Sequence, residues 1–250
     1  MKHVFVAIIV FVMCGRLYAQ PSFIDNQLSN PRVADIFKGK EDTLQKQFAE
    51  AHLKWPPEQV YLRSFKYDSK LEVWVRSDRN QAFTLFKTYK ICALSGALGP
   101  KRIEGDYQVP EGFYCINMFN PKSLYHLSLG INYPNASDLV LSDSLKPGND
   151  IYIHGNCITV GCIPIQDNQI EELYILASEA KNQGEDFIPI HIFPVAFNNA
   201  KSREYLEKTT KEDQAYQKFA TNIRQVYDYF ELHKKLPVIS VNKKGEYVIM

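Results

Sequence analysis

The sequence predicts an α+β protein, in which a β-rich domain built as a sheet or sandwich carries flanking helices and a helical C-terminal appendage. Short alternating apolar runs follow one another between residues 60 and 119, as in sequential strands. Residues 168–184 show the spacing of an amphipathic helix, and residues 201–235 contain no Pro or Gly. The 250 residues, 45% of them hydrophobic, suffice for one good core with appendages or for two small domains.

The first 19 residues are predicted to be a cleaved signal peptide. Lys2 and His3 precede an apolar run over residues 4–13, and Ala19 before Gln20 fits a cleavage site. The run is too short for a membrane-spanning helix. We therefore expect export to the periplasm or cell envelope, with membrane contact only during export. A lipoprotein attached through Cys14 is the alternative, although the residue before it fits that signal poorly.

Residues 20–59 are predicted to form an N-terminal leader and one helix. Residues 20–40 are polar and contain two prolines, so no element is expected there. Between residues 43 and 55 the spacing of apolar residues is close to helical, and Pro56-Pro57 ends the pattern.

The next 60 residues are predicted to form four strands and a long loop. Residues 61–67 and 71–76 read as a hairpin, because Leu71, Val73 and Val75 alternate with polar or amphipathic residues. Residues 83–92 and 113–119 are two further strands. The loop between them, residues 98–112, has no periodicity and several charges, and such loops commonly carry binding groups.

The remaining elements follow in order. His126 stands at the start of a strand, residues 132–135 form a turn, and residues 139–149 are a polar connection into a strand at 151–153. A helix follows, with Asn168 as its N-cap and Gly184 as its C-terminal stop. A strand at 187–193 contains His191, which we interpret as structural. Residues 201–235 form a helix packed on the domain, and residues 237–250 a closing hairpin.

The chemistry is predicted to lie in the segment from Asp150 to Ile165. An apolar run leads to His154-Gly155, and Gly161-Cys162 follows a few residues later. A thiolate is the reactive form of cysteine, and a neighbouring imidazole can generate it. We therefore predict Cys162 as a nucleophile and His154 as its base.

This segment, His-Gly-x-Cys-x-Thr-x-Gly-Cys, resembles the L,D-transpeptidase catalytic domain (YkuD-like) family, in particular its short-spaced, YafK-type murein branch. Two further blocks, residues 95–114 and 126–135, resemble the family in the same order. The sequence departs from the pattern of most members where Val160 replaces a second histidine and Pro164 an arginine. The resemblance spans residues 61–193 and implies a catalytic domain at 60–195, with residues 196–250 as a helical extension and hairpin.

The resemblance also implies a reaction and its participants. The expected enzyme acts on peptidoglycan stem peptides through a Cys162 thioester, and transfers the acyl group to an amine or hydrolyses it. Gly155 would help to orient His154, and the N–H groups around Gly161 and Cys162 would stabilise the oxyanion. A wall-linked protein is a further expected partner, and no cofactor, metal, nucleotide or nucleic acid is expected. The expected substrate-binding residues are Lys101, Glu104, Asp106, Glu111, His126, Asn132 and Thr159.

Three questions stay open at this point. His154, Cys157 and Cys162 could instead be zinc ligands, although their spacing is irregular and no fourth ligand lies nearby. Cys92 and Cys115 could be free or bridged, and a Cys157–Cys162 bridge would block the nucleophile. Cys157 is interpreted first as a small core residue. The alternative function is a non-catalytic envelope module that binds stem peptide or a partner protein through the same groove.

Overall fold

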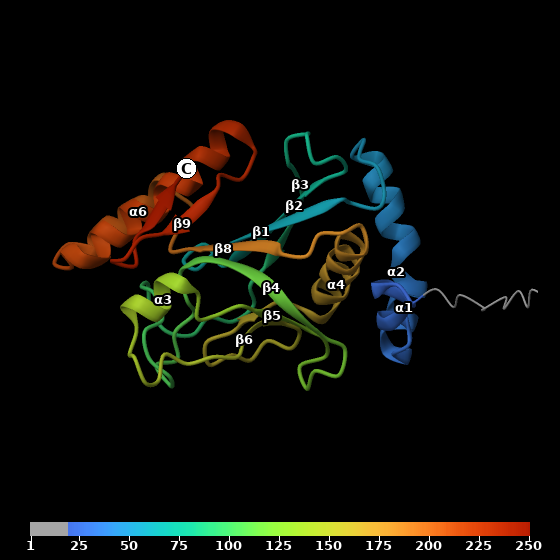
Figure 1. Ribbon diagram of the computed structural model, residues 1–250, viewed down its shortest axis with the longest axis horizontal. Coiled ribbons are helices and arrows are strands. Elements are labelled where there is room, and N and C mark those ends of the chain that lie inside the picture. The colour runs from blue at the N-terminus through green and yellow to red at the C-terminus, as the bar shows by residue number, and fades with distance from the viewer. Residues whose placement is uncertain (1–19) are drawn as a thin grey trace, which may run out of the picture.

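The computed structural model describes residues 20–250, and the expected signal peptide lies outside that range (Figure 1). In residues 20–250 an eight-stranded mixed sheet has the order β3-β2-β1-β8-β4-β5-β6-β7. The pairs β1–β8 and β6–β7 are parallel, and the other neighbours are antiparallel. The α+β prediction is confirmed. The strands are β1 (Gln59–Phe65), β2 (Lys70–Arg76), β3 (Thr84–Lys90), β4 (Gly112–Asn120), β5 (Ser128–Ile131), β6 (Ile151–His154), β7 (Ile163–Pro164) and β8 (Ile188–Phe193).

The two edges of this sheet meet. Ile91, just after β3, forms an isolated antiparallel bridge with Ile165, just after β7. The Cys92 N–H donates to the Pro164 carbonyl oxygen over 3.0 Å, and Cys92 forms a disulfide with Cys157. We call these contacts between residues 91–92 and 164–165 the seam. The sheet is therefore curled until its first and last edges join.

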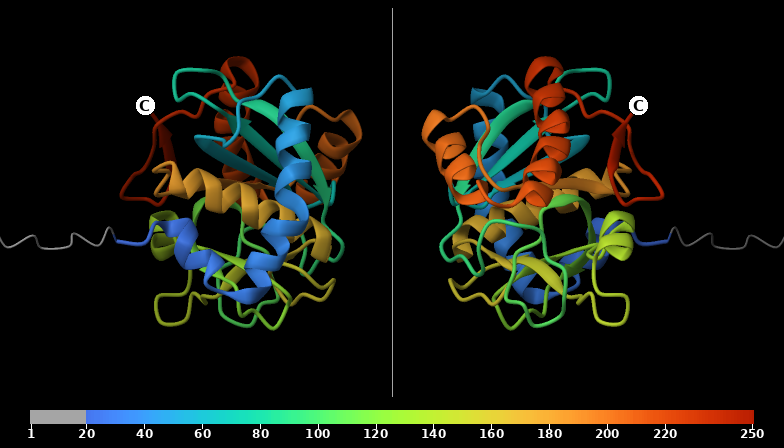
Figure 2. Two further views of the ribbon diagram at one scale, coloured as in Figure 1. Left: turned by 90° about the vertical axis from the view of Figure 1, so that its right-hand side faces the viewer. Right: turned by 90° about the vertical axis from the view of Figure 1, so that its left-hand side faces the viewer.

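Helices cover the curled sheet from two sides (Figure 2). On one side α4 (Asp167–Asn182) packs against α1 (Phe23–Leu28) and α2 (Pro31–Glu50). Their apolar residues, such as Phe37, Phe48 and Leu173, form the main core with the sheet. On the other side α5 (Ala200–Thr210) and α6 (Gln214–His233) pack with the hairpin of β9 (Ile239–Val241) and β10 (Tyr247–Ile249). A second aromatic-rich cluster lies there, including Phe65, Phe193 and Tyr227.

The N-terminal segment is more helical than the sequence suggested. Pro31 does not interrupt α2 but opens it, because the first position of a helix needs no backbone N–H donor. The Asn30 side chain accepts from the N–H groups of Arg32 and Val33, which caps this end. The expected helix at 43–55 is thus the second half of a helix that ends at Glu50.

Other helices and strands differ less from their predicted boundaries. The predicted polar connection at 139–149 begins within α3 (Ala136–Leu141), which Asn135 and Asp138 cap reciprocally. The helix α4 begins two residues earlier than expected, at Asp167, so Gln166 and not Asn168 is at its N-cap position. The expected helix at 201–235 is divided into α5 and α6, since Asp213 caps a new start by accepting from the Tyr216 N–H. The four early strands and the closing hairpin are confirmed. In residues 20–250 no helix has the length and apolar character needed to cross a membrane.

Candidate active site

His154 ends strand β6, and Cys162 stands next to its parallel neighbour β7. In the β6–β7 pair, Ile153 stands beside Ile163 and His154 beside Pro164. Cys162 comes directly before β7, two positions from Pro164. Cys162 therefore lies toward the start of β6, where its sulfur contacts the Asp150 carbonyl oxygen, whereas His154 lies at the end of β6.

The His154 ring is enclosed and is held by the backbone of the next residue, Gly155. Its side chain is almost fully buried, with 2% of its surface exposed, and the Tyr125 ring lies 4.7 Å from it between centroids. Nδ1 lies 2.5 Å from the Gly155 carbonyl oxygen. A carbonyl only accepts hydrogen bonds, so Nδ1 carries the proton and Nε2 keeps its lone pair. Burial lowers the pKa of His154, although the bond to Gly155 opposes this shift. The neutral ring has the protonation state of a general base.

The Cys162 thiol lies at the other end of β6. Within residues 20–250 the hydrogen-bond partner of its sulfur is the Asp150 carbonyl oxygen, at 3.6 Å. Burial raises the pKa of the Cys162 thiol, and the Asp150 carboxylate adds to this rise. The Tyr152 N–H and the Lys101 ammonium act in the opposite direction but do not outweigh burial. The resting thiol is therefore protonated at neutral pH.

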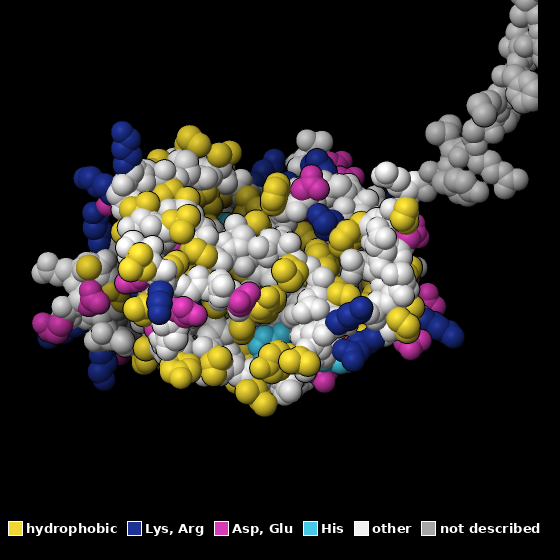
Figure 3. Space-filling model, turned by 60° about the horizontal axis from the view of Figure 1, so that its bottom comes forward, with side chains coloured by type: hydrophobic (Ala, Val, Ile, Leu, Met, Phe, Trp, Pro, Cys, Tyr) yellow, Lys and Arg dark blue, Asp and Glu magenta, His cyan; other side chains and the backbone are white. Residues whose placement is uncertain are grey.

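A cavity of about 310 Å³ opens beside Cys162. Figure 3 turns the lower side of Figure 1 toward the reader, where hydrophobic side chains gather around exposed histidine atoms. The charges in the lining come from Lys101, Glu104 and Asp150. The full lining consists of Lys101, Glu104, Gly105, Tyr107, Gly148, Asn149, Asp150, Ile151, Val160, Gly161 and Cys162.

Two of the expected substrate-binding residues, Lys101 and Glu104, line this cavity, and a third supports it. The Asp106 carboxylate pairs with the Lys101 ammonium and accepts from the backbone N–H groups of Arg102, Ile103 and Gln108. Burial alone would raise the pKa of Asp106, but these hydrogen bonds outweigh it and lower the pKa. Asp106 therefore shapes the loop and holds Lys101 in the wall.

Glu111 and Asn132 are not at the cavity, and their expected contact with substrate is not supported. Glu111 has no exposed surface, and it accepts from the Gly99 N–H and the Tyr216 hydroxyl and pairs with Lys66 at 3.1 Å. The Asn132 side-chain oxygen accepts from the Cys115 N–H at 2.7 Å, between β4 and the end of β5. Both residues have structural roles in the described chain.

His126 and Thr159 support the site from different sides. His126 Nε2 lies 2.7 Å from a Glu171 carboxylate oxygen on α4, and Glu171 also pairs with Lys40 of α2. The Thr159 hydroxyl donates to the Cys162 carbonyl oxygen and accepts from the Gly161 N–H. This Gly161 N–H is therefore already engaged, and of the expected oxyanion donors the Cys162 N–H remains.

Two glycines fit where no side chain would. A Cβ at Gly155 would lie 2.5 Å from an Asp167 carboxylate oxygen and 3.0 Å from the Tyr125 carbonyl oxygen. Gly161 has φ +140°, and a Cβ there would lie 3.3 Å from the Gln108 carbonyl oxygen. The chain can thus turn tightly on both sides of the segment that separates the base from the thiol.

The sequence did not single out Asp150 as a site residue or Tyr125 at all, although each has a place at the site. Asp150 contributes to the cavity lining and to the environment of the sulfur, and its position directly before the strand of His154 was a usable signal. Tyr125 packs on the His154 ring and precedes His126, within reach of a block that was recognised.

Cys157 is not available as a ligand for the zinc site considered from the sequence. Cys157 is bonded to Cys92 and offers no thiolate, which leaves His154 and Cys162 from the proposed set. Across residues 20–250 no group of three potential metal-ligating side chains is found. The cysteine pairing also differs from both bridges considered from the sequence, and Cys115 and Cys162 are free.

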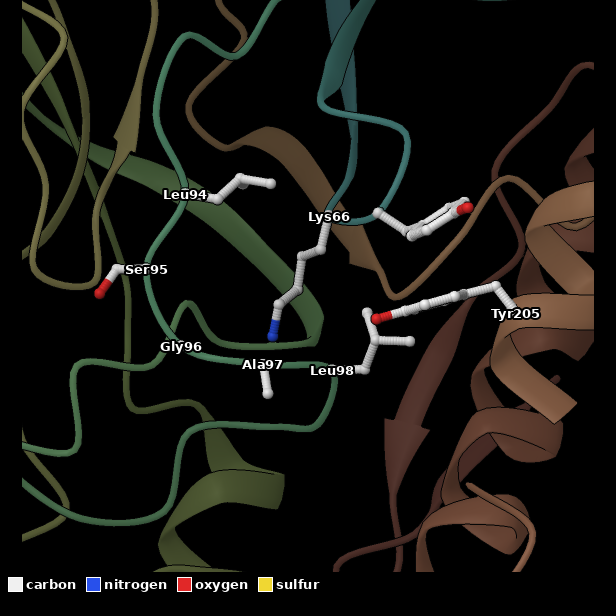
Figure 4. Close-up of a pocket in the computed structure, with 8 residues that line it drawn as sticks. Lys66, Leu94, Ser95, Gly96, Ala97, Leu98 and Tyr205 are labelled. Carbon is white, nitrogen blue, oxygen red and sulfur yellow. The ribbon is translucent and has the colours of Figure 1, made fainter. Parts of the chain in front are cut away.

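A second cavity of about 160 Å³ is lined by residues 94–98 together with Lys66, Tyr67 and Tyr205 (Figure 4). Tyr205 reaches from α5 toward Leu98, and its ring stacks on Tyr67 with 4.1 Å between centroids. The Lys66 ammonium beneath is already bonded to the carbonyl oxygens of Gly99 and Val109. This cavity marks the contact between α5, the turn after β1 and residues 94–98.

Comparison with known proteins identifies the family. The chain is 32% identical over 192 residues to the protein named "Putative L,D-transpeptidase YafK" in Escherichia coli strain K12 and equally in E. coli O157:H7. The alignment covers 76% of this chain and 73% of each relative. The chain therefore belongs to the YafK-like L,D-transpeptidase family.

Comparisons with family models and with solved structures do not extend this family assignment. No family model matches the chain. Among solved structures it is similar to the helical cell shape determining protein Pgp2 from Campylobacter jejuni, with 20% identity, a TM-score of 0.45 and coverage of 74% and 73% of the two chains. It is also similar to Bd1075 from Bdellovibrio bacteriovorus, with 22% identity, a TM-score of 0.39 and coverage of 75% and 78%.

Proposed function

We propose that the protein is an exported, cysteine-dependent enzyme of the L,D-transpeptidase type, which acts on peptidoglycan stem peptides. The observation that carries the proposal is the placement of His154 at the end of β6 and of Cys162 directly before the neighbouring strand β7, with a cavity at the thiol, in a member of this family. In the proposal residues 60–195 form the catalytic domain, and residues 196–250 extend it. A wall-linked protein is a further proposed partner.

The proposed reaction is an acyl transfer through a thioester. Cys162 gives its proton to Nε2 of His154, and the sulfur attacks the carbonyl carbon of the scissile amide. The tetrahedral intermediate collapses when the C–N bond breaks, and the leaving amine takes the proton from His154. An acceptor amine then attacks the thioester to complete transpeptidation, or water attacks it to complete hydrolysis.

The resting geometry places one requirement on this mechanism. The sulfur has to leave the Asp150 carbonyl oxygen and meet Nε2 when substrate fills the cavity. Catalytic hydrogen bonds are often long or misaligned without substrate and tighten in the complex. Gly155 holds the proton of Nδ1 throughout, so Nε2 stays available as the base. The Cys162 N–H is assigned to the oxyanion, because the Gly161 N–H is engaged by Thr159.

A second candidate is a non-catalytic envelope module that binds stem peptide or a partner protein in the same cavity. The orientation of the thiol favours this candidate, since the sulfur bonds to Asp150 and burial raises its pKa. A binding role requires neither a thiolate nor a free Nε2.

Muropeptide products separate the two candidates. Purified protein is incubated with peptidoglycan, and the soluble products are identified by mass spectrometry for wild type, Cys162→Ala and the control Cys115→Ala. Cys115 is a free, half-buried cysteine on β4 and does not line the cavity. The enzyme is supported if wild type and the control give new products that Cys162→Ala lacks. An unchanged muropeptide pattern with wild type would reject it, and retained binding would then favour the module.

Adding a D-amino acid acceptor distinguishes the two fates of the thioester. Exchange of the terminal residue of the stem for the added amino acid indicates transfer to an amine. Shortened stems without exchange indicate hydrolysis.

A further inference from the structure

We propose that the Cys92–Cys157 disulfide is a positioning element of the Cys162 site, which closes the seam and holds segment 155–162 between the proposed base and nucleophile. Its effect on turnover rests on the proposed function, whereas its effect on the segment and on the thiol does not. Neither cysteine is assigned contact with substrate.

The disulfide joins two distant parts of the chain at one place. Cys157 lies within segment 155–162, next to the edge strand β7. Cys92 is 65 residues earlier in the sequence and follows β3, the strand at the opposite edge of the sheet. Next to it the seam has one backbone bridge, Ile91 with Ile165, and one hydrogen bond from Cys92 to Pro164. Few ladder bonds therefore assist the covalent link.

Segment 155–162 has little packing of its own. The side chains of Ile158 and Val160 are 61% and 68% exposed, so they add little to the core. Its side-chain hydrogen bonds are local, as those of Thr159 with Gly161 and Cys162, or lie at its two ends. The Asn156 N–H donates to Asp167 at one end, and the Cys162 thiol bonds to the Asp150 carbonyl oxygen at the other. A backbone held this sparsely opens readily unless something else restrains it. The disulfide supplies that restraint between the two ends.

The consequence reaches Cys162 directly. Gly161 and Cys162 form the far end of the segment and part of the cavity lining. If the segment is released from Cys92, the sulfur and the wall beside it lose their fixed position relative to β6. Misplacement of reacting groups by about 1 Å can cost on the order of a hundredfold in rate.

External thiol reagents can break and re-form the Cys92–Cys157 disulfide. A dithiol reductant transfers two electrons and two protons to the disulfide, giving the Cys92 and Cys157 thiols and the cyclic disulfide of the reductant. Removing the reductant and adding oxidised glutathione reverses the step, with two molecules of reduced glutathione as the product.

The test uses the full mature protein with Cys115→Ser as the common background, so that Cys162 is the free thiol of the oxidised form. Dithiothreitol is added to the folded protein without denaturant, and amide hydrogen exchange is followed by mass spectrometry. Reduction should accelerate exchange at residues 91–92 and 156–163 by about tenfold or more, with little change in β1, β2 and β8. Reoxidation should restore the original rates.

A second readout follows the thiol itself. The iodoacetamide reaction of Cys162 is measured against pH by peptide mass spectrometry. In the oxidised protein burial raises the pKa of Cys162, so its reactivity should rise only above the ordinary thiol range of about 8.5. After reduction water reaches the sulfur, and the midpoint should move down toward that range. A disulfide that only stabilised the folded state would leave this profile unchanged.

The double variant Cys92→Ser with Cys157→Ser is the matched control. It should reproduce the reduced profile and show no response to dithiothreitol. If the variant fails to fold, reduction of the wild-type disulfide under native conditions decides alone. Unchanged exchange and an unchanged pH midpoint after complete reduction would overturn the proposal, as would free thiols at both positions in protein isolated from the cell envelope.

Turnover separates this inference from the proposed function. If wild type has no activity on peptidoglycan, the proposed function fails, while hydrogen exchange and alkylation still test the disulfide. If wild type is active, reduction should lower product formation by about tenfold or more and reoxidation should restore it. Full activity in the reduced protein would show that the disulfide does not position the site.

Discussion

Burial decides what each charged residue at this site can do. Lys101 and Glu104 line the cavity, whereas Glu111 lies a few residues away in sequence and is fully enclosed. Both kinds of residue belong to one loop without periodicity, so the sequence assigned them a common role. The depth of each side chain depends on how the loop folds against α6, which no local pattern reports.

His191 shows the opposite outcome, since the sequence identified it as structural and the structure confirms this. Its Nδ1 lies 2.8 Å from the Tyr61 hydroxyl, inside an aromatic cluster. Burial, assisted by the positive charge of Arg63, lowers the pKa of His191 to about 3. The folded state thus holds this histidine neutral.

We predict a stability loss in mild acid that depends on His191. Below the unfolded-state pKa, about 6.5, the unfolded chain binds a proton that the folded chain refuses until about pH 3. From pH 7 to pH 5 the unfolding free energy of wild type should fall by roughly 2 kcal/mol more than that of His191→Phe. Urea denaturation at both pH values measures this difference. His52→Asn, at an exposed histidine, should keep the wild-type fall, and parallel curves for wild type and His191→Phe would contradict the prediction.

At the scale of elements, α6 and the cavity loop are connected through one buried cluster. The Tyr216 hydroxyl of α6 donates to Glu111, which also accepts from the Gly99 N–H and pairs with Lys66. The Lys66 ammonium in turn donates to the carbonyl oxygens of Gly99 and Val109. Helix α6 therefore helps to fix the loop that forms one wall of the cavity.

We predict that Glu111→Gln destabilises the fold by about 3 kcal/mol, because it leaves the Lys66 ammonium buried without its counter-charge. Tyr216→Phe removes one hydrogen bond to the same carboxylate and keeps the ion pair, so it should cost roughly 1.5 kcal/mol. Urea denaturation at pH 7 gives both values. Equal stabilities of Glu111→Gln and wild type, within about 0.5 kcal/mol, would show that the cluster is not coupled to the fold in this way.

The elements themselves were predictable where their pattern was local. The alternation in residues 71–76 gives β2, and the apolar stripe after residue 168 gives α4. The start of α2 was missed because Pro31 was interpreted as an interruption, although proline suits the first turn of a helix. The proposed base and nucleophile were found from their motif, but the partner of the sulfur was not, since it depends on how β6 and β7 pair.

At the scale of the whole molecule, the Cys92–Cys157 pairing was beyond the sequence. It joins the two edges of a sheet whose order is not the order of the chain, and cysteine spacing alone does not give connectivity. A disulfide of this kind persists in an oxidising compartment. This agrees with the proposed export.

We predict that the mature protein begins at Gln20. The N-terminal run and the residues before this position fit a cleaved signal peptide. Intact mass measurement of the protein from the envelope fraction should show a chain of residues 20–250, and Ala19→Arg should leave the precursor uncleaved. An envelope-fraction protein that still begins at Met1 would contradict the prediction.

The place of β8 has a consequence for how the molecule assembles. This strand comes last among the eight in sequence, yet it lies between β1 and β4 in the middle of the sheet. A growing or translocating chain that ends before residue 188 would hold two partial sheets, residues 59–90 and residues 112–164, without the central strand that pairs with both β1 and β4. Cooperative folding therefore has to wait for Ile188–Phe193, and unpaired strand edges are exposed until that moment.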